Sequence, residues 1–207
     1  MTWTQQAFNA FWDTVASSAD GARLVACIPG GLIYVSVDSG VNWIGYDVNR
    51  NWECVASSGD GTKMVACVNG GQIYTSTDTG QTWTARDSNR NWIAVAASGD
   101  GTRLVAAVKS GQVYTSSDSG LTWTPRESNR VWAAVCTSED GTRLGACVSD
   151  LPVFTTGQIY TCDFLVAETT AGTSGYLHAY PKAAVELQYV GSDTFAPLSF
   201  VGRFSAK

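Results

Sequence analysis

The sequence predicts an all-β fold of four tandem 40-residue units, each with four short antiparallel strands. Two aromatic residue types recur at this spacing, a regularity typical of repeat architectures. They are Trp12, Trp52, Trp92 and Trp132, and Tyr34, Tyr74 and Tyr114. Tyr160 comes six residues late, which places an insertion at 151–156. The 21 glycines among 207 residues favour tight turns between short strands.

The second unit shows the strands of the repeat most clearly. Residues 52–57, 63–68, 72–77 and 81–86 have the length and composition of strands. The turns between them hold Gly59-Asp60-Gly61, Asn69-Gly70-Gly71 and Asp78-Thr79-Gly80. Asn-Gly-Gly is a hairpin signal, because these residues tolerate a positive φ. Four short antiparallel strands per repeat predict a β-propeller blade.

The third turn carries the pattern S-x-D-x-G-x-x-W in three successive units. An Asp carboxylate can accept backbone N–H bonds inside a turn, Gly permits a left-handed residue, and Trp can bury a large surface between strands. The residues of the three copies are Ser36, Asp38, Gly40, Trp43, Ser76, Asp78, Gly80, Trp83, Ser116, Asp118, Gly120 and Trp123.

This pattern resembles the Asp box, or BNR repeat, of sialidase-type β-propellers. The resemblance covers about residues 2–163. It implies that the motif residues hold turns together, and in that family the Asp boxes lie away from the catalytic face. We therefore expect Asp38, Asp78 and Asp118 to be structural.

The repeats predict a propeller domain at 1–163 and a β-rich C-terminal extension at 164–207. Thr2-Trp3-Thr4 matches Thr82-Trp83-Thr84, so the chain begins with the last strand of a blade, and this strand could complete the fourth blade. Two architectures follow. Either one chain closes a four-bladed ring, or chains join end to end and complete a larger ring. We favour the single-chain ring, because one clasp closes it without a partner.

The C-terminal extension contains two further strand patterns. Residues 183–190 alternate, with Val185, Leu187 and Tyr189 expected on one face, and a turn follows at 191–194. Residues 195–204 form a second strand that Pro197 interrupts. The segment resembles an extension that follows BNR-like repeats in uncharacterised bacterial proteins. Because so few strands are marginal alone, we expect it to serve in attachment or oligomerisation.

The six cysteines favour burial over metal binding. Cys27, Cys67 and Cys147 occupy equivalent positions where the third unit has Ala107, as expected of a small buried site. Cys54 and Cys67 should lie on facing strands, and a disulfide between them is left open. The sequence has no CxxC motif and a single histidine, His178, so it predicts no metal site.

Composition and charge narrow the range of partners. Lys and Arg number 13 against 18 Asp and Glu, a net charge of −5 that argues against a nucleic-acid surface. No apolar run reaches 18 residues, and the first residues lack the pattern of a secretory signal. We therefore expect no membrane span. A location on a virion, on an extracellular surface or in the cytoplasm is consistent with these features.

Three arginines are candidates for ligand binding. Arg50, Arg90 and Arg130 recur in the context Asn-Arg-x-Trp and should lie on the face opposite the S-x-D-x-G-x-x-W turns. We expect Trp52, Trp92 and Trp132 to be exposed beside them, and together these residues could bind an anionic or sugar ligand. In the competing interpretation each arginine stacks on a neighbouring Trp or pairs with the acid three residues earlier: Asp47, Asp87 or Glu127.

The sequence does not predict an enzyme. A sialidase-like glycosidase needs an arginine cluster, a Tyr/Glu nucleophilic pair and a general acid from different blades, whereas the arginines here are copies of one position. We predict no catalytic residue and no cofactor. The first functional hypothesis is an assembly protein that forms a homo-oligomer, such as a virion appendage, a filament or a surface layer. The alternatives are a lectin-like module that binds carbohydrate, a glycosidase, and a photosystem-assembly factor of the Asp-box class.

Overall fold

The computed structural model describes residues 5–149 and 157–163, and strands within 170–206. The strands of the repeat region are β1 (Thr14–Ser17), β2 (Leu24–Cys27), β3 (Pro29–Ser36), β4 (Ile44–Ser57), β5 (Met64–Ser76), β6 (Thr84–Ala97), β7 (Leu104–Gly111), β8 (Val113–Ser116), β9 (Thr124–Pro125), β10 (Arg130–Thr137), β11 (Arg143–Val148) and β12 (Gln158–Asp163). Every pairing among them is antiparallel. The prediction of an all-β fold is confirmed.

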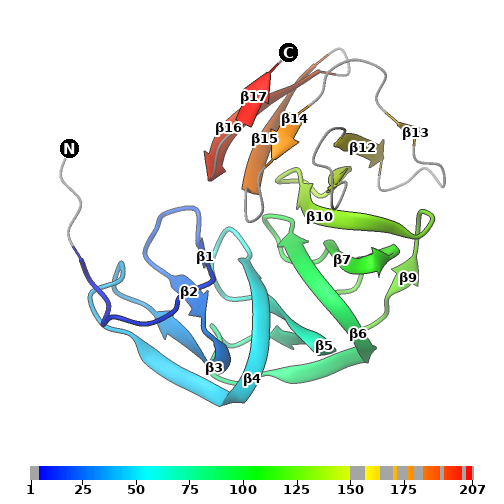
Figure 1. Cartoon of the computed structure of the whole chain (residues 1–207). Helices are drawn as coiled ribbons and strands as arrows, with labels where there is room; N and C mark the ends of the chain where they lie inside the picture. The colour runs from blue at the N-terminus through cyan, green and yellow to red at the C-terminus, as the bar shows by residue number, and fades with distance from the viewer. Residues whose placement is uncertain are drawn as a thin grey trace.

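The strands form four units that repeat one meander (Figure 1). Unit 1 contains β1, β2, β3 and the start of β4, and unit 2 contains the rest of β4, β5 and the start of β6. Unit 3 contains the rest of β6 with β7, β8 and β9. Unit 4 contains β10, β11 and β12. In unit 2 both middle strands belong to β5, which includes Gly70 at φ 76°.

Successive units are joined by continuous strands. The last strand of unit 1 and the first strand of unit 2 are both parts of β4, and β6 joins units 2 and 3 in the same way. The register shifts where β4 pairs with β3, and Asp47 adopts φ 60° there. The strand expected at 81–86 begins only at Thr84, because residues 81–83 belong to the preceding turn.

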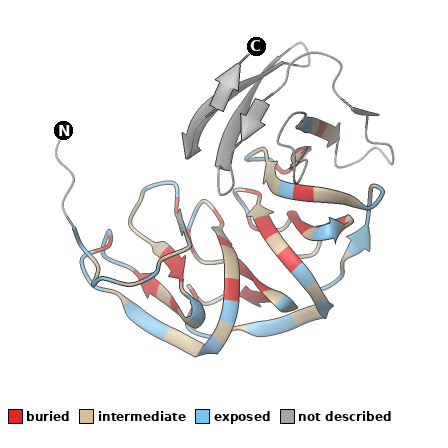
Figure 2. Cartoon of the chain, viewed as in Figure 1, coloured by how far each residue is buried: buried red, intermediate tan, exposed pale blue. Residues whose placement is uncertain are grey.

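The core lies between the units, where one sheet face packs on the next (Figure 2). We call the face that a unit turns toward the preceding unit its N-side face, and the opposite one its C-side face. Between units 1 and 2, Val25 and Ile33 of one C-side face meet Trp52 and Val55 of the next N-side face. The other two junctions repeat this arrangement with equivalent residues. Both faces of the inner units are therefore buried.

Backbone hydrogen bonds link the units in a row along their first turns. The N–H of Ala19 donates to the carbonyl of Gly59, that of Gly59 to Gly99, and that of Gly99 to Glu139, each at 2.7 Å. An ideal Cβ on Gly59 would lie 3.2 Å from the Gly99 carbonyl oxygen, so the contact favours a residue without a side chain. We call this row the backbone belt.

The four units fan out in an arc (Figure 1). The first strands of successive units contact one another in the order β1, β4, β6 and β10. Within the described residues, the backbone belt runs from Ala19 to Glu139 and does not return from unit 4 to unit 1.

The extension contains β13 (Thr170–Ala171), β14 (Leu177–Ala179), β15 (Ala184–Gly191), β16 (Thr194–Val201) and β17 (Phe204–Ala206). The strand expected at 183–190 is β15, which pairs with β16; Pro197 lies opposite Leu187 at a register shift. β13 pairs with β12, and β15 contacts β10. The residues Thr2-Trp3-Thr4, expected to complete the fourth blade, and the insertion at 151–156 lie outside the described residues.

Candidate functional site

The three S-x-D-x-G-x-x-W turns share one hydrogen-bond network. In the second copy Ser76 Oγ donates to Asp78 Oδ1 at 2.7 Å and accepts from the Gly80 N–H at 2.9 Å. Asp78 Oδ1 also accepts from the Thr82 N–H at 2.9 Å. The Trp83 indole donates to the Gly80 carbonyl, also at 2.9 Å. The other two copies repeat these contacts.

These contacts confirm that the motif aspartates accept backbone N–H bonds. The glycines adopt the expected positive φ, for example 77° at Gly80. Hydrogen bonds lower the pKa of Asp38, most strongly those from the Asn42 N–H and side chain. Burial alone would raise the pKa of Asp78, but the bonds from Thr82 and Ser76 outweigh it and the net shift is downward. The carboxylates are thus held ionised inside the turns.

The first turn of each unit contains a second carboxylate network. In unit 2 Ser58 Oγ donates to Asp60 Oδ1 at 2.6 Å, and the Thr62 N–H donates to the same oxygen at 2.9 Å. Units 1, 3 and 4 repeat this arrangement around Asp20, Asp100 and Asp140. The sequence showed these aspartates only as members of repeated turns. The signal for their role was a Ser two residues before each Asp.

This second network makes a pH-dependent contribution to stability. Hydrogen bonds from Ser58 and Thr62 lower the pKa of Asp60 from 3.8 to about 2. Because the folded state favours the ionised form, the contribution is complete above the ordinary pKa and is lost as the pH falls from about 4 to about 2. We expect Asp60→Asn to lose less stability than the wild type between pH 5 and pH 3, as measured by urea unfolding at both pH values. Equal losses in the two proteins would contradict this assignment.

The repeated arginines form ion pairs at the unit junctions. Arg50 Nε lies 3.2 Å from Asp47 Oδ2, and the guanidinium carbon lies 4.4 Å from the centre of the Tyr74 ring. Arg90 pairs with Asp87 and stacks on Tyr114, while Arg130 pairs with Glu127 and stacks on Tyr160. The predicted pairing three residues apart is confirmed. The closest aromatic partner is the tyrosine rather than the tryptophan.

The arginines and the S-x-D-x-G-x-x-W turns lie at opposite ends of the strands. Arg90 pairs in register with Gly71, at the end of the β5 arm where residues 69–71 turn. The turn that holds Asp78 follows the other end of that arm, Ser76. The arginines therefore lie on the expected face, about one third exposed. Ligand binding by Arg50, Arg90 and Arg130 stays a prediction.

The three tryptophans beside the arginines are buried, and the expectation that they are exposed is wrong. Trp52 and Trp92 are 0% exposed and Trp132 is 2% exposed. Each indole lies edge-on to the tyrosine of its own unit, as for Trp92 and Tyr114 at 5.1 Å. A buried indole has no free face on which a sugar ring could stack.

The cysteines are free thiols, and each is buried or half-buried. Cys54 and Cys67 are register partners on facing strands, as predicted, and are not joined by a disulfide. Burial raises the pKa of Cys54 to about 12 and that of Cys67 well above its ordinary value. Cys27 and Cys67 are fully buried, which confirms the small buried site, whereas Cys147 is half-buried.

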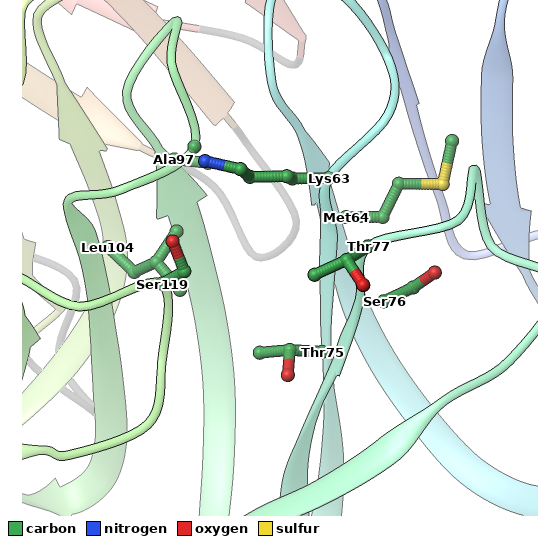
Figure 3. A pocket seen from close by; sticks show the side chains of 9 residues that line it. Lys63, Met64, Thr75, Ser76, Thr77, Ala97, Leu104 and Ser119 are labelled. Carbon is green, nitrogen blue, oxygen red and sulfur yellow. The ribbon is translucent and has the colours of Figure 1, made fainter.

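A small cavity lies between units 2 and 3 (Figure 3). Its lining includes Thr75 and Ser76 from β5 and Leu104 from β7. The volume of about 10 Å³ holds no more than one water molecule. Within the described residues no three His, Cys, Asp or Glu side chains cluster as metal ligands would. The same part of the chain contains no helix long and apolar enough to cross a membrane.

No protein-family model and no curated protein sequence matches this chain. Solved structures do. The structure described as YCF48 from Cyanidioschyzon merolae has a TM-score of 0.63 at 15% identity, covering 100% of this chain and 75% of that one. "YCF48 bound to D1 peptide" has a TM-score of 0.59 at 18% identity, over 82% of this chain and 57% of that one. The GH74 enzyme of Niastella koreensis has a TM-score of 0.64 at 15% identity, over 94% and 38%.

Together with the repeated antiparallel meander, these similarities establish the fold class as a β-propeller. At such low identity they establish the fold alone. The chain spans 57% and 38% of the second and third of these structures, that is, about half their length or less. Enzymes and a peptide-bound protein both occur among the similar propellers.

Proposed function

We propose that this chain is a non-catalytic propeller that acts as a subunit of a larger assembly, such as a virion appendage, a filament or a surface layer. The observation that supports the proposal is that the repeated polar residues bind other groups of the same chain. In the described units the repeated aspartates accept hydrogen bonds from their own turns. Each repeated arginine pairs with the acid three residues earlier and stacks on the tyrosine of the following unit.

Catalysis on a propeller needs different residues contributed by different blades, whereas here the same residues recur in each unit. Because the repeated polar groups bind one another, they support a structural role over a catalytic one. The lectin-like alternative depended on exposed indoles, and Trp52, Trp92 and Trp132 are buried. No observation therefore favours carbohydrate binding over assembly.

The test is the mass of the protein in solution with and without residues 164–207. We expect the full chain to form a particle of several copies, and the shortened chain to form a particle of fewer copies. The reason is that the short strands of the extension need a surface to pack on. A melting curve of the shortened chain checks that its units remain folded. A monomer in both cases would contradict the assembly role.

A further inference from the structure

The N-side face of unit 1 is only partly covered, whereas the corresponding faces of units 2 and 3 are buried. Val15 is 64% exposed, although its equivalents Val55 and Val95 are each 5% exposed. The rest of this face consists of three half-buried residues and one buried residue, namely Trp12, Leu24 and Tyr34, and Ala26. In each later unit such a face packs on the C-side face before it.

Unit 1 also lacks the polar groups of the other junctions. Ala7 and Ala10 stand at the positions of the Asp47–Arg50 ion pair. The ring of Phe8 lies 5.2 Å from that of Tyr34, in place of the arginine that covers Tyr74 in unit 2. Phe8 is 49% and Phe11 is 91% exposed.

An apolar face that the chain leaves partly uncovered marks an interaction surface. A repeat whose outer face meets water usually carries polar residues there, and this face of unit 1 does not.

Among the residues that the structure describes, the backbone belt has a group without a backbone partner at each end. The carbonyls of Gly59, Gly99 and Glu139 each accept an N–H from the preceding unit. The equivalent carbonyl, on Ala19, accepts none from the described residues, and at the other end the Glu139 N–H donates to none of them. Ala19 and Glu139 are both exposed. The acceptor at one end of the arc therefore matches the donor at the other.

The C-side face of unit 4 stays apolar, although one cross-strand pair on it differs from the earlier units. The cross-strand pair Ala96–Val105 of unit 3 becomes Cys136–Gly145 in unit 4. Cys136 Sγ lies 2.8 Å from the position that a Cβ on Gly145 would take, so the sulfur fills part of the space of the missing side chain. Ile159 is equivalent to Ile73 of unit 2. β15 of the extension contacts β10 of this unit.

We propose that the N-side face of unit 1 binds the C-side face of unit 4 of a second copy of this chain, so that two copies close one ring of eight units. The junction would repeat the three that the chain already contains, with the second copy's Glu139 N–H donating to the Ala19 carbonyl. Eight blades lie within the usual range of propellers, and two copies in such a ring make two identical junctions. The proposal rests on the assembly role proposed above and names its partner.

Two cysteines at the ends of the backbone belt test the geometry in the full chain. Residues joined by a backbone hydrogen bond have Cα atoms about 5–6 Å apart, within reach of a disulfide. We expect Ala19→Cys combined with Glu139→Cys to form, under mild oxidation, a disulfide between two chains. A non-reducing gel would then show a band of twice the chain mass. Neither single variant should give this band, because two copies of one position do not meet.

A third substitution asks whether the junction forms through the predicted face. In the double-cysteine background, Val15→Glu would place a charge where Val55 is buried in unit 2, and burying an unpaired charge is unfavourable. The yield of linked chains should fall about tenfold or more, which corresponds to about 1.4 kcal/mol. Val37→Glu is the matched control, because Val37 is also 64% exposed but lies next to the Asp38 turn. It should leave the yield unchanged.

Three results would overturn this inference. A disulfide within one chain would mean that a single copy closes a ring of four units. Absence of linked chains, or linked chains that Val15→Glu leaves unchanged, would mean that this face does not bind unit 4. The proposed function fails separately, through a monomeric mass of the full chain. A particle of several copies without the linked pair would retain the assembly role and reject only this junction.

Discussion

Trp92→Ala should destabilise the protein by about 3–5 kcal/mol, the usual cost of removing a large buried aromatic side chain. Trp92 is fully buried in the junction between units 2 and 3. It packs with Leu104 of its own unit and with Ile73 of the preceding one. The substitution therefore removes contacts within the sheet of unit 3 and contacts with the sheet of unit 2. Urea unfolding followed by tryptophan fluorescence and circular dichroism measures the loss.

Trp12→Ala is the matched control, because Trp12 is the equivalent residue of unit 1. Its indole contacts Tyr34 and Trp43 within the same unit, yet the side chain is only half-buried. We expect a smaller loss than for Trp92→Ala when both are measured in dilute protein. Equal losses would mean that most of the stability of the tryptophan comes from its own sheet and little from the neighbouring unit.

The sequence predicted the repeat units because their signals are local. The 40-residue spacing of Trp and Tyr located the units, and glycines such as Gly70 and Gly80 marked turns that need a positive φ. The hydrogen bonds of Asp78 were predictable for the same reason, since donor and acceptor lie within the same short turn.

The burial of Trp52, Trp92 and Trp132 was not predictable from the local pattern. A strand inside a propeller packs on both faces, so apolar and polar residues do not alternate clearly along it. Trp52 follows Arg50 by two residues, and this context resembled an exposed binding site. The φ of 60° at Asp47, within a continuous strand, was not predictable either. Asp is common in turns that end a strand as well as at left-handed positions, so its presence does not separate the two cases.

Gly80→Ala should cost about 2–5 kcal/mol, from two separate causes. Gly80 has φ 77°, and placing an L-residue there costs about 1–2 kcal/mol. The new Cβ would also lie 2.6 Å from Cγ2 of Val35, a buried side chain of the preceding unit. Because Val is stiff at χ1 and the core is close-packed, relief requires backbone movement, and overpacking adds about 1–3 kcal/mol. The free energy of unfolding in urea measures the sum.

Gly40→Ala separates the two causes, because the same turn in unit 1 has no preceding unit. Gly40 has φ 87°, but the nearest atom to its ideal Cβ is Leu24 Cδ1 at 3.5 Å, an ordinary contact. In dilute protein we therefore expect only the conformational cost of about 1–2 kcal/mol. If two copies join as proposed, Gly40→Ala should also place its Cβ against unit 4 of the second copy and weaken their association. A variant that unfolds as easily as Gly80→Ala in dilute protein would show that the left-handed turn, rather than the contact between units, dominates both losses.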